Sequence, residues 1–231
     1  MLPFGSESRP ATAPGGFLFF CIFALFFFPT LPVSFDFTKN IVLENSRVRL
    51  RLLEPTDFEA LKAVAFDPEV WQFTTTRADD TLSLAAYLAA AGQDRQAERR
   101  YAFAIVDRAT GQLAGSTSYY NIAPDDQRLS IGYTWVGRAF QRTGLNRAAK
   151  HLLLSYAFDG LRYERVELET DSRNLQSQQA MRRMGATEEG TLRRHRLTQG
   201  GYRRDTVIFS IIRPEWEGLR QSVFKEYHAE S

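Results

Sequence analysis

Cysteine is almost absent from this chain: Cys21 is the single one among 231 residues. One thiol cannot form an internal disulfide or build a cysteine-based metal cluster. Histidine is also scarce, and His151, His195 and His228 lie far apart without metal-ligand spacing. We therefore expect no metal site.

A charge excess of either sign is also missing. The 29 basic and 27 acidic residues leave a net charge of +2, which gives no support for general nucleic-acid binding. Apolar residues make up 44% of the chain and charged residues 24%, as in ordinary globular proteins. The length allows one domain plus extra segments, and we find no internal repeat.

The chain has only a short hydrophobic run, over residues 17–28 (FLFFCIFALFFF). Pro29 interrupts this run well before the roughly 20 apolar residues that a membrane-spanning helix needs. A signal peptide fits its length better, but only Arg9 is basic ahead of it and no A-x-A-like cleavage site follows. A membrane association is therefore not expected unless residues 17–28 are retained, when exposed phenylalanines would favour it.

One folded domain is expected between two atypical ends. We interpret residues 1–35 as a start-site artefact or a dispensable extension outside the fold. The domain is expected at residues 36–222. Residues 223–231 are expected to form a charged tail.

The most informative stretch, residues 130–159, predicts a strand, a glycine-containing loop and a long helix. β-Branched and aromatic residues favour a strand over 131–136. From Leu145 to Tyr156 apolar residues recur at helical spacing, and Gly160 would end the helix. The opposite side of this helix is expected to carry the polar residues Arg147, Lys150, His151 and Ser155.

The loop at residues 141–146 opens directly into that helix and therefore exposes backbone N–H groups without partners. Those donors and the positive end of the helix dipole favour an anion such as a phosphate. Gly144 has no Cβ, so a ligand could approach the backbone closely, and Arg138 and Arg142 add positive charge. The alternative is an ordinary strand–helix connection, because one glycine is a weak motif.

The remaining patterns complete a mixed α+β order. Further strands are expected at 47–53, 101–106, 112–122, 165–170, 187–194 and 203–212, and helices at 55–65, 82–99, 174–184 and from Pro214. We expect a predominantly antiparallel sheet with flanking helices and one parallel, right-handed crossover through the central helix.

The loop Gln141-Arg142-Thr143-Gly144-Leu145-Asn146 resembles motif A of the GNAT acyl-CoA N-acyltransferases, an (Arg/Gln)-x-x-Gly-x-(Gly/Ala/Asn) loop that holds the CoA pyrophosphate. It is similar to the RimJ/RimL-type branch, in which the last loop position is often Asn. The resemblance extends from about Ile41 to about Trp216 and includes the stretches 171–177, 183–186, 189–195 and 204–210.

This resemblance implies an acetyl-CoA-dependent N-acetyltransferase in which a primary amine attacks directly in a ternary complex. It implies a cytoplasmic enzyme, monomeric or homodimeric, that uses acetyl-CoA as co-substrate and no metal. The branch points to a protein N-terminal amine, as in ribosomal-protein acetylation. The alternatives are a small amine (an amino acid, a polyamine or an antibiotic) and a non-catalytic acyl-CoA-binding protein. The two helices after the first strand usually help to shape the acceptor pocket.

The resemblance also implies which residues bind the cofactor. The pantetheine would lie along the strand edge at Trp135, Val136 and Gly137, where backbone groups would bind it. Asn174 and Ser177 would face its thiol end. Trp135 could instead be a core aromatic, and Asn174 and Ser177 could instead cap a helix. The expected cofactor-binding residues are Trp135, Val136, Gly137, Gln141, Arg142, Thr143, Gly144, Leu145, Asn146, Asn174 and Ser177.

The general acid of many family members, a tyrosine seven residues after that Asn, is replaced here by Met181. Three alternatives therefore stay open for the departing thiolate. Ser177 could assist it, water could, or it could leave unaided, because an ordinary thiol pKa of about 8.5 permits departure at neutral pH.

The general base is equally open. Ser130 stands where related sequences often have Glu, and Tyr133 is expected on the opposite face of the strand. His195 is a candidate because an unperturbed histidine pKa is about 6.5. Proton loss to bulk water through a chain is an equal alternative. The other candidates are Tyr133, Glu167 and Glu169, whereas Asp205 is expected to be a structural ion-pair partner.

Overall fold

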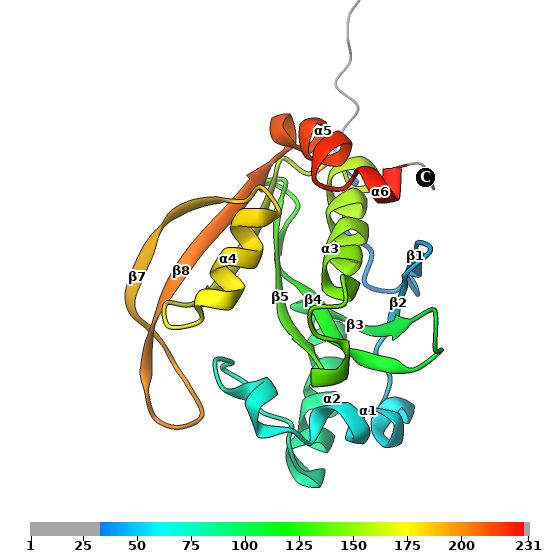
Figure 1. The fold of residues 1–231 in the computed structure, drawn as a ribbon, viewed down its shortest axis with the longest axis vertical. Helices are drawn as coiled ribbons and strands as arrows, with labels where there is room; N and C mark the ends of the chain where they lie inside the picture. The colour runs from blue at the N-terminus through cyan, green and yellow to red at the C-terminus, as the bar shows by residue number, and fades with distance from the viewer. Residues whose placement is uncertain (1–32, 229–231) are drawn as a thin grey trace, which may run out of the picture. The chain divides into compact units, whose positions relative to one another are not determined.

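The computed structural model of the protein describes residues 33–228 (Figure 1). The apolar run at 17–28 and nearly all of the expected extension at 1–35 lie outside this range. Within it, no helix combines the length and the hydropathy that crossing a bilayer requires.

A single mixed sheet organises residues 33–228. Its strand order is β1-β2-β3-β4-β5-β6-β8-β7, and every neighbouring pair is antiparallel except β5 and β6, which are parallel. This confirms the predicted α+β class and its one parallel crossover. The strands are β1 Leu43–Glu44, β2 Val48–Leu52, β3 Arg100–Asp107, β4 Leu113–Ala123, β5 Arg128–Val136, β6 Arg165–Asp171, β7 Thr187–Leu197 and β8 Arg203–Ile212.

Helices cover both faces of this sheet. In β3, Tyr101 and Phe103 belong to one buried apolar cluster and Ala102 and Ala104 to another, because successive strand residues point to opposite faces. The first cluster packs against α3, α4 and α5, and the second against α1 and α2 (Figure 1). The helices are α1 Phe58–Ala65, α2 Thr81–Gln96, α3 Leu145–Ser155, α4 Leu175–Arg183, α5 Arg213–Ser222 and α6 Lys225–His228.

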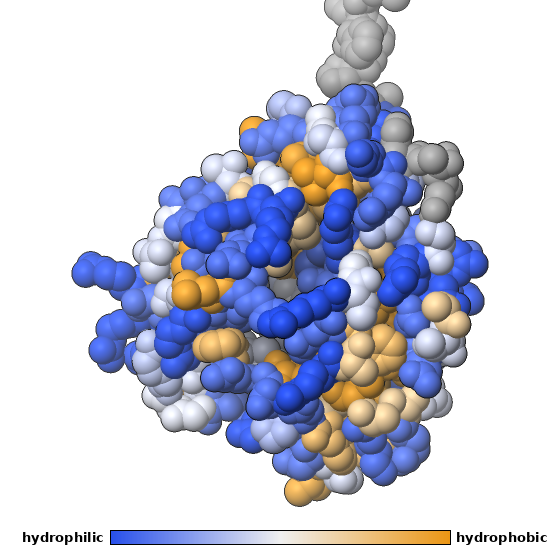
Figure 2. All heavy atoms as spheres, in the orientation of Figure 1, coloured by the Kyte–Doolittle hydropathy of each residue, from blue (hydrophilic) through white to orange (hydrophobic). Residues whose placement is uncertain are grey.

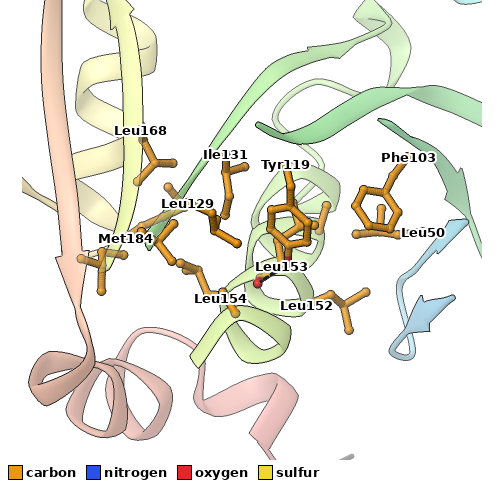
Figure 3. Close-up of a cluster of buried hydrophobic side chains, with 14 of the residues drawn as sticks. Leu50, Phe103, Tyr119, Leu129, Ile131, Leu152, Leu153, Leu154, Leu168 and Met184 are labelled. Carbon is orange, nitrogen blue, oxygen red and sulfur yellow. Dashed lines mark hydrogen bonds between the residues drawn. The ribbon is translucent and has the colours of Figure 1, made fainter. Parts of the chain in front are cut away.

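The central helix α3 forms where the apolar spacing predicted it. Leu153 and Leu154 point toward Leu129 and Ile131 of β5 (Figure 3), and the Tyr119 hydroxyl donates to the Leu153 carbonyl at 2.5 Å. Burial of each such side chain contributes roughly 1.5–3 kcal/mol, so this interface fixes α3 against β4 and β5.

The expectation that Lys150 and His151 lie on an exposed side of α3 is wrong. Their exposed fractions are only 5% and 3%. The His151 ring lies 5.1 Å from the Tyr227 ring and 5.5 Å from the Phe224 ring, so the C-terminal helices cover that side. Lys150 instead turns into the cleft that is described below.

Residues near both ends of the described range pack against the rest of the domain. Phe224 and Tyr227 are buried in the main core, although they lie in the stretch that we expect to be a charged tail. At the other end, the Val33 N–H donates to the Leu161 carbonyl at 3.0 Å, and Phe35 packs edge-on against Tyr101 at 5.5 Å.

A β-bulge interrupts β5. Ser118 pairs with Gly132 but Ser116 pairs with Trp135, so Tyr133 and Thr134 together oppose one residue of β4. Tyr133 adopts a left-handed φ of 49°. The bulge reverses the in–out alternation that follows it, and this reversal decides where several cleft side chains point.

The predicted separation of Ser130 and Tyr133 onto opposite faces is therefore wrong. The Tyr120 ring meets the Tyr133 ring edge-on at 5.3 Å, and Tyr120 is also the cross-strand neighbour of Ser130. Directly opposite residues share a face, so Ser130 and Tyr133 both lie on the face that carries Tyr120.

Candidate active site

The parallel strands β5 and β6 separate halfway along. They pair from Arg128 with Arg165 to Ile131 with Leu168, and beyond that point residues 132–136 have no partner strand on this side in the described structure. A cleft of about 180 Å³ occupies the opening, lined by α3, by α4 and by the loop at residues 73–76. Figure 2 shows hydrophilic side chains gathered around the hollow between α3 and α4.

The loop before α3 presents a run of free amides at one end of this cleft. Among residues 33–228, no hydrogen-bond acceptor is paired with the backbone N–H groups of Arg142, Thr143, Gly144, Asn146 or Arg147. These groups surround the positive end of the α3 dipole. Such an arrangement is suited to an anion of phosphate type.

The backbone conformation of this loop turns its amides to one side. Arg142 and Gly144 both have left-handed φ angles, of 60° and 88°, and alternation of left- and right-handed residues makes a concave nest of N–H groups. A Cβ built on Gly144 would have no protein atom within 4 Å. The space over Gly144 is therefore open to a ligand.

Side chains from three directions hold the loop in place. The Gln141 amide donates to the Val136 carbonyl at 3.0 Å, the Thr143 hydroxyl donates to the Phe140 carbonyl at 2.8 Å, and Arg47 donates to the Thr143 carbonyl at 3.2 Å. These contacts use side chains and carbonyls and leave the N–H groups unpaired.

The two arginines of the loop differ. Arg142 is exposed and forms no ion pair within residues 33–228, so it adds positive charge as expected. Arg138 instead donates to Asp67 at 2.9 Å and also pairs with Glu69. The hydrogen bond from Arg138 lowers the pKa of Asp67, and the expected contribution of Arg138 to the anion site is thereby neutralised.

The β5 edge residues expected to contact the cofactor are not equivalent. The Trp135 ring lies 4.8 Å from the Trp71 ring and is buried, so its side chain is the core aromatic that we considered. The Gly137 N–H donates to Ala114 at 2.8 Å, and a Cβ on Gly137 would lie 2.7 Å from Val64. The Gly137 amide is therefore already used inside the protein, whereas Trp135 itself lines the cleft.

The start of α4 contributes a helix cap and two side chains that line the cleft. The Asn174 side-chain oxygen accepts from the Ser177 N–H at 3.0 Å, which makes Asn174 the helix cap. Both residues also line the cleft, as does Met181 one turn further. The Asn174 amide nitrogen and the Ser177 hydroxyl have no partner among the described residues. The structure therefore brings Asn174 and Ser177 together with Asn146 in one cleft.

The opposite wall carries charged side chains that are paired with one another. Glu169 accepts from Arg204 at 3.2 Å and pairs with Arg196 at 3.3 Å. Glu169, a candidate base, is therefore already engaged by two guanidinium groups. Glu167, another candidate, is paired with Arg165 at 2.9 Å outside the cleft lining.

Two tyrosines complete this wall. Burial raises the pKa of the Tyr120 hydroxyl well above its usual value. The Tyr133 ring lies under the Arg100 guanidinium at 4.4 Å. Tyr133 also lines a second hollow of about 330 Å³ beside α2, together with Asp94 and Arg100.

His195 does not reach the cleft. It is exposed on β7, in a stretch where the β7–β8 register shifts between Leu192 and Arg196, and it is not part of the cleft lining. The structure thus does not bring His195 and Ser177 together. Asp205 also differs from expectation: its carboxylate accepts the Arg194 N–H at 2.6 Å and forms no ion pair within residues 33–228.

Lys150 is the cleft residue that the sequence reasoning missed. Its Nζ donates to the Thr134 hydroxyl at 2.9 Å, and burial lowers the pKa of Lys150 to about 7. One signal was present: Lys150 follows Asn146 by four residues, so both share one face of α3. Arg196, Arg204 and the loop at 73–76 were missed as well, and no local pattern indicated them.

Potential metal ligands do not cluster in the described part of the chain. No group of three His, Cys, Asp or Glu residues there is placed to hold a metal ion.

Comparisons with known proteins agree with this geometry. The family model described as "Acetyltransferase (GNAT) domain" matches residues 47–187. A Bacillus subtilis (strain 168) protein named "Putative ribosomal N-acetyltransferase YdaF" is 31% identical over 182 residues, which cover 75% of this chain and 96% of that protein.

Solved structures show the same fold. A GCN5-related N-acetyltransferase from Brucella melitensis superposes with a TM-score of 0.76 at 26% identity, covering 85% of this chain and 89% of that one. The fold is also that of Mycobacterium smegmatis RimJ in complex with CoA-disulfide, with a TM-score of 0.70 at 19% identity over 81% and 96% of the two chains. The strands, the crossover helix and the family match lead to one conclusion: this chain belongs to the GNAT family and is an acyltransferase of the N-acetyltransferase type.

Proposed function

We propose that this protein transfers the acetyl group of acetyl-CoA to a primary amine that attacks it directly. The observation that carries the proposal is the set of unpaired amides of Arg142, Thr143, Gly144, Asn146 and Arg147 beside an open strand edge. A diphosphate would bind those amides, and an extended amide-containing arm would lie along residues 132–136.

The transfer needs few protein groups. The amine nitrogen attacks the thioester carbon, the carbon–sulfur bond breaks, and the nitrogen loses a proton. The Ser177 hydroxyl is free to donate to the departing sulfur, and Asn174 and Asn146 face the same cleft. A thiolate with an ordinary pKa of about 8.5 can also leave unaided. Because Glu169 is held by two arginines, we assign the proton of the amine to water.

The acceptor that we favour is the N-terminal amine of a polypeptide. The ribosomal N-acetyltransferase name of the relative supports this choice. A small amine is the second candidate. We expect the reaction in the cytoplasm, where acetyl-CoA is present.

The test is thiol release from acetyl-CoA, followed with a thiol-reactive dye, using the full chain. The acceptors are peptides with free N-termini, the same peptides with blocked N-termini, and a panel of small amines. Release only with free peptide N-termini would support the favoured acceptor. Release only with small amines would select the second candidate. If calorimetry shows that acetyl-CoA binds but no amine causes thiol release, the protein is a non-catalytic acyl-CoA-binding protein and not an enzyme.

A further inference from the structure

One amino group of this chain lies inside the cleft. The sequence contains four lysines: Lys39, Lys62, Lys150 and Lys225. Lys39, Lys62 and Lys225 are accessible to solvent, whereas only 5% of Lys150 is exposed. The position of Lys150 on α3 directs its amine into the opening between β5 and β6.

The surroundings of this amine favour its neutral form. No carboxylate pairs with Lys150 in the described structure, and the one carboxylate that lines the cleft, Glu169, is held by Arg196 and Arg204. Thr134 on β5 accepts the hydrogen bond of this amine, and Asn146, four residues earlier on α3, lines the same cleft; neither side chain is charged. An uncompensated ammonium would be costly to bury, and this desolvation lowers the pKa of Lys150 to about 7.

The geometry places the amine where an acyl carrier would lie. Its Nζ is 2.9 Å from the hydroxyl of Thr134, a residue of the unpaired β5 edge directly after the bulge. Lys150 is also one helical turn beyond Asn146, whose N–H belongs to the anion-binding loop. An arm that extends from that loop along the β5 edge must pass this amine.

We propose that Lys150 is an internal acetyl acceptor, so that the protein acetylates itself inside its own cleft. The inference rests on the proposed use of acetyl-CoA. The neutral Nζ attacks the thioester carbon, the carbon–sulfur bond breaks, and the nitrogen loses one proton as the thiolate takes one up. The products are acetyl-Lys150 and CoA. The added group occupies cleft volume and abolishes a titratable amine, so acetylation should weaken further cofactor binding.

A simpler possibility is that Lys150 only supports the strand through its bond to Thr134. The two possibilities differ in reactivity. At pH 7 roughly half of an amine with a pKa near 7 is neutral, against about one in 2,500 for an ordinary lysine. Lower basicity reduces nucleophilicity in part, so we expect labelling of Lys150 to exceed that of each surface lysine at least about tenfold.

The experiment is incubation of the full chain with acetyl-CoA that carries an isotopically labelled acetyl group, without acceptor amine, followed by peptide mass spectrometry of all four lysines. We expect label at Lys150 in excess of Lys62. An excess of free CoA should suppress labelling of Lys150 and leave the slow labelling of Lys62 unchanged, because only the former depends on the cleft. Lys62→Met is the matched control, and Lys150→Met should remove only the fast-labelled site.

The possible outcomes distinguish failure of the Lys150 inference from failure of the proposed acetyltransferase function. Equal labelling of Lys150 and Lys62 in protein that acetylates amines would overturn the inference and leave the proposed function intact. Absence of both CoA binding and thiol release would overturn both.

Discussion

The two walls of the cleft present different kinds of chemical groups to a ligand. On the α3 side the ligand-facing groups are the backbone amides of the loop at 141–146, together with the side chains of Asn146 and Lys150. On the β6–β8 side they are all side chains, and the Glu169 carboxylate is paired with both the Arg196 and the Arg204 guanidinium groups. Backbone donors have no pKa in the accessible range and depend only on chain conformation. Side-chain charges depend on pH, on salt and on each partner being present.

This difference suggests a division of labour. A wall of amides suits the invariant part of a reaction, the nucleotide carrier, because every residue type supplies the same donor. A wall of paired charges suits the variable part, the acceptor, because single substitutions change it. The following predictions test that division, from the largest expected effect to the smallest.

Gly144→Val should weaken CoA binding at least about 100-fold, or roughly 3 kcal/mol. The new side chain would fill the open space over the loop. Valine is also strained at the φ of 88°, by roughly 1–2 kcal/mol of folding stability. Gly111→Val is the matched control, because Gly111 has a φ of 71° and open surroundings but belongs to the turn between β3 and β4 and not to the loop at 141–146. Calorimetry should find equal strain in both variants and lost affinity in only one. If Gly144→Val binds CoA with unchanged affinity, the diphosphate of CoA does not bind at this loop.

Glu169→Gln should lower the free energy of unfolding by about 2–3 kcal/mol, because it leaves the buried Arg204 without a charged partner. It should also raise KM for the amine while CoA affinity stays within about twofold. Glu164→Gln removes the exposed pair with Arg213 and should cost less than about 0.5 kcal/mol. If Glu169→Gln loses CoA affinity and amine affinity equally, the proposal that the α3 side binds the cofactor and the β6–β8 side binds the acceptor is wrong.

Asn174→Ala and Ser177→Ala should have unlike effects at the start of α4. The first removes a cap and should cost about 1 kcal/mol of stability, with some loss of CoA affinity. The second keeps the cap, because Asn174 accepts from the Ser177 backbone, and should lower kcat up to about tenfold with little change in stability. If Ser177→Ala leaves kcat unchanged, the thiolate leaves without help from this hydroxyl.

Glu189→Gln should have the smallest effect, and one that depends on pH. Hydrogen bonds from Arg165 on β6, and then from Ser210 on β8, lower the pKa of Glu189 to about 2. The stabilisation is therefore complete above the ordinary Glu pKa of about 4.3 and is lost as the pH falls toward about 2. Because Glu189 is 38% exposed, solvent screening should keep the loss below about 1 kcal/mol.

Urea unfolding measures this dependence directly. The stability difference between wild type and Glu189→Gln should be present at about pH 6 and reduced at about pH 3. Glu188→Gln, which removes the neighbouring exposed pair with Arg182, serves as control. If the stability difference between wild type and Glu189→Gln grows as the pH falls, the predicted direction of the pH dependence is wrong.

Local patterns were enough to predict α3 and the last strand. The spacing of apolar residues from Leu145 fixed the helix, and residues 203–212 were recognised as the strand that is β8. The anion site at the loop 141–146 stays a prediction, and it rests on backbone groups at a helix start, which need no knowledge of tertiary contacts.

The features that were missed depend on residues distant in the sequence. Lys150 and His151 look like surface residues until α5, α6 and β6 are placed around them. The bulge at Tyr133 breaks a period of two that the sequence itself does not interrupt. Arg204 and Glu169 meet across β8 and β6, and no spacing rule connects positions 35 residues apart.

The burial of Phe224 and Tyr227 has a practical consequence. The rings of Phe224 and Tyr227 pack against His151, which directly follows Lys150 on α3. We therefore expect that proteolytic removal of residues 224–228, or a purification tag placed next to them, disturbs the cleft from the far side of α3.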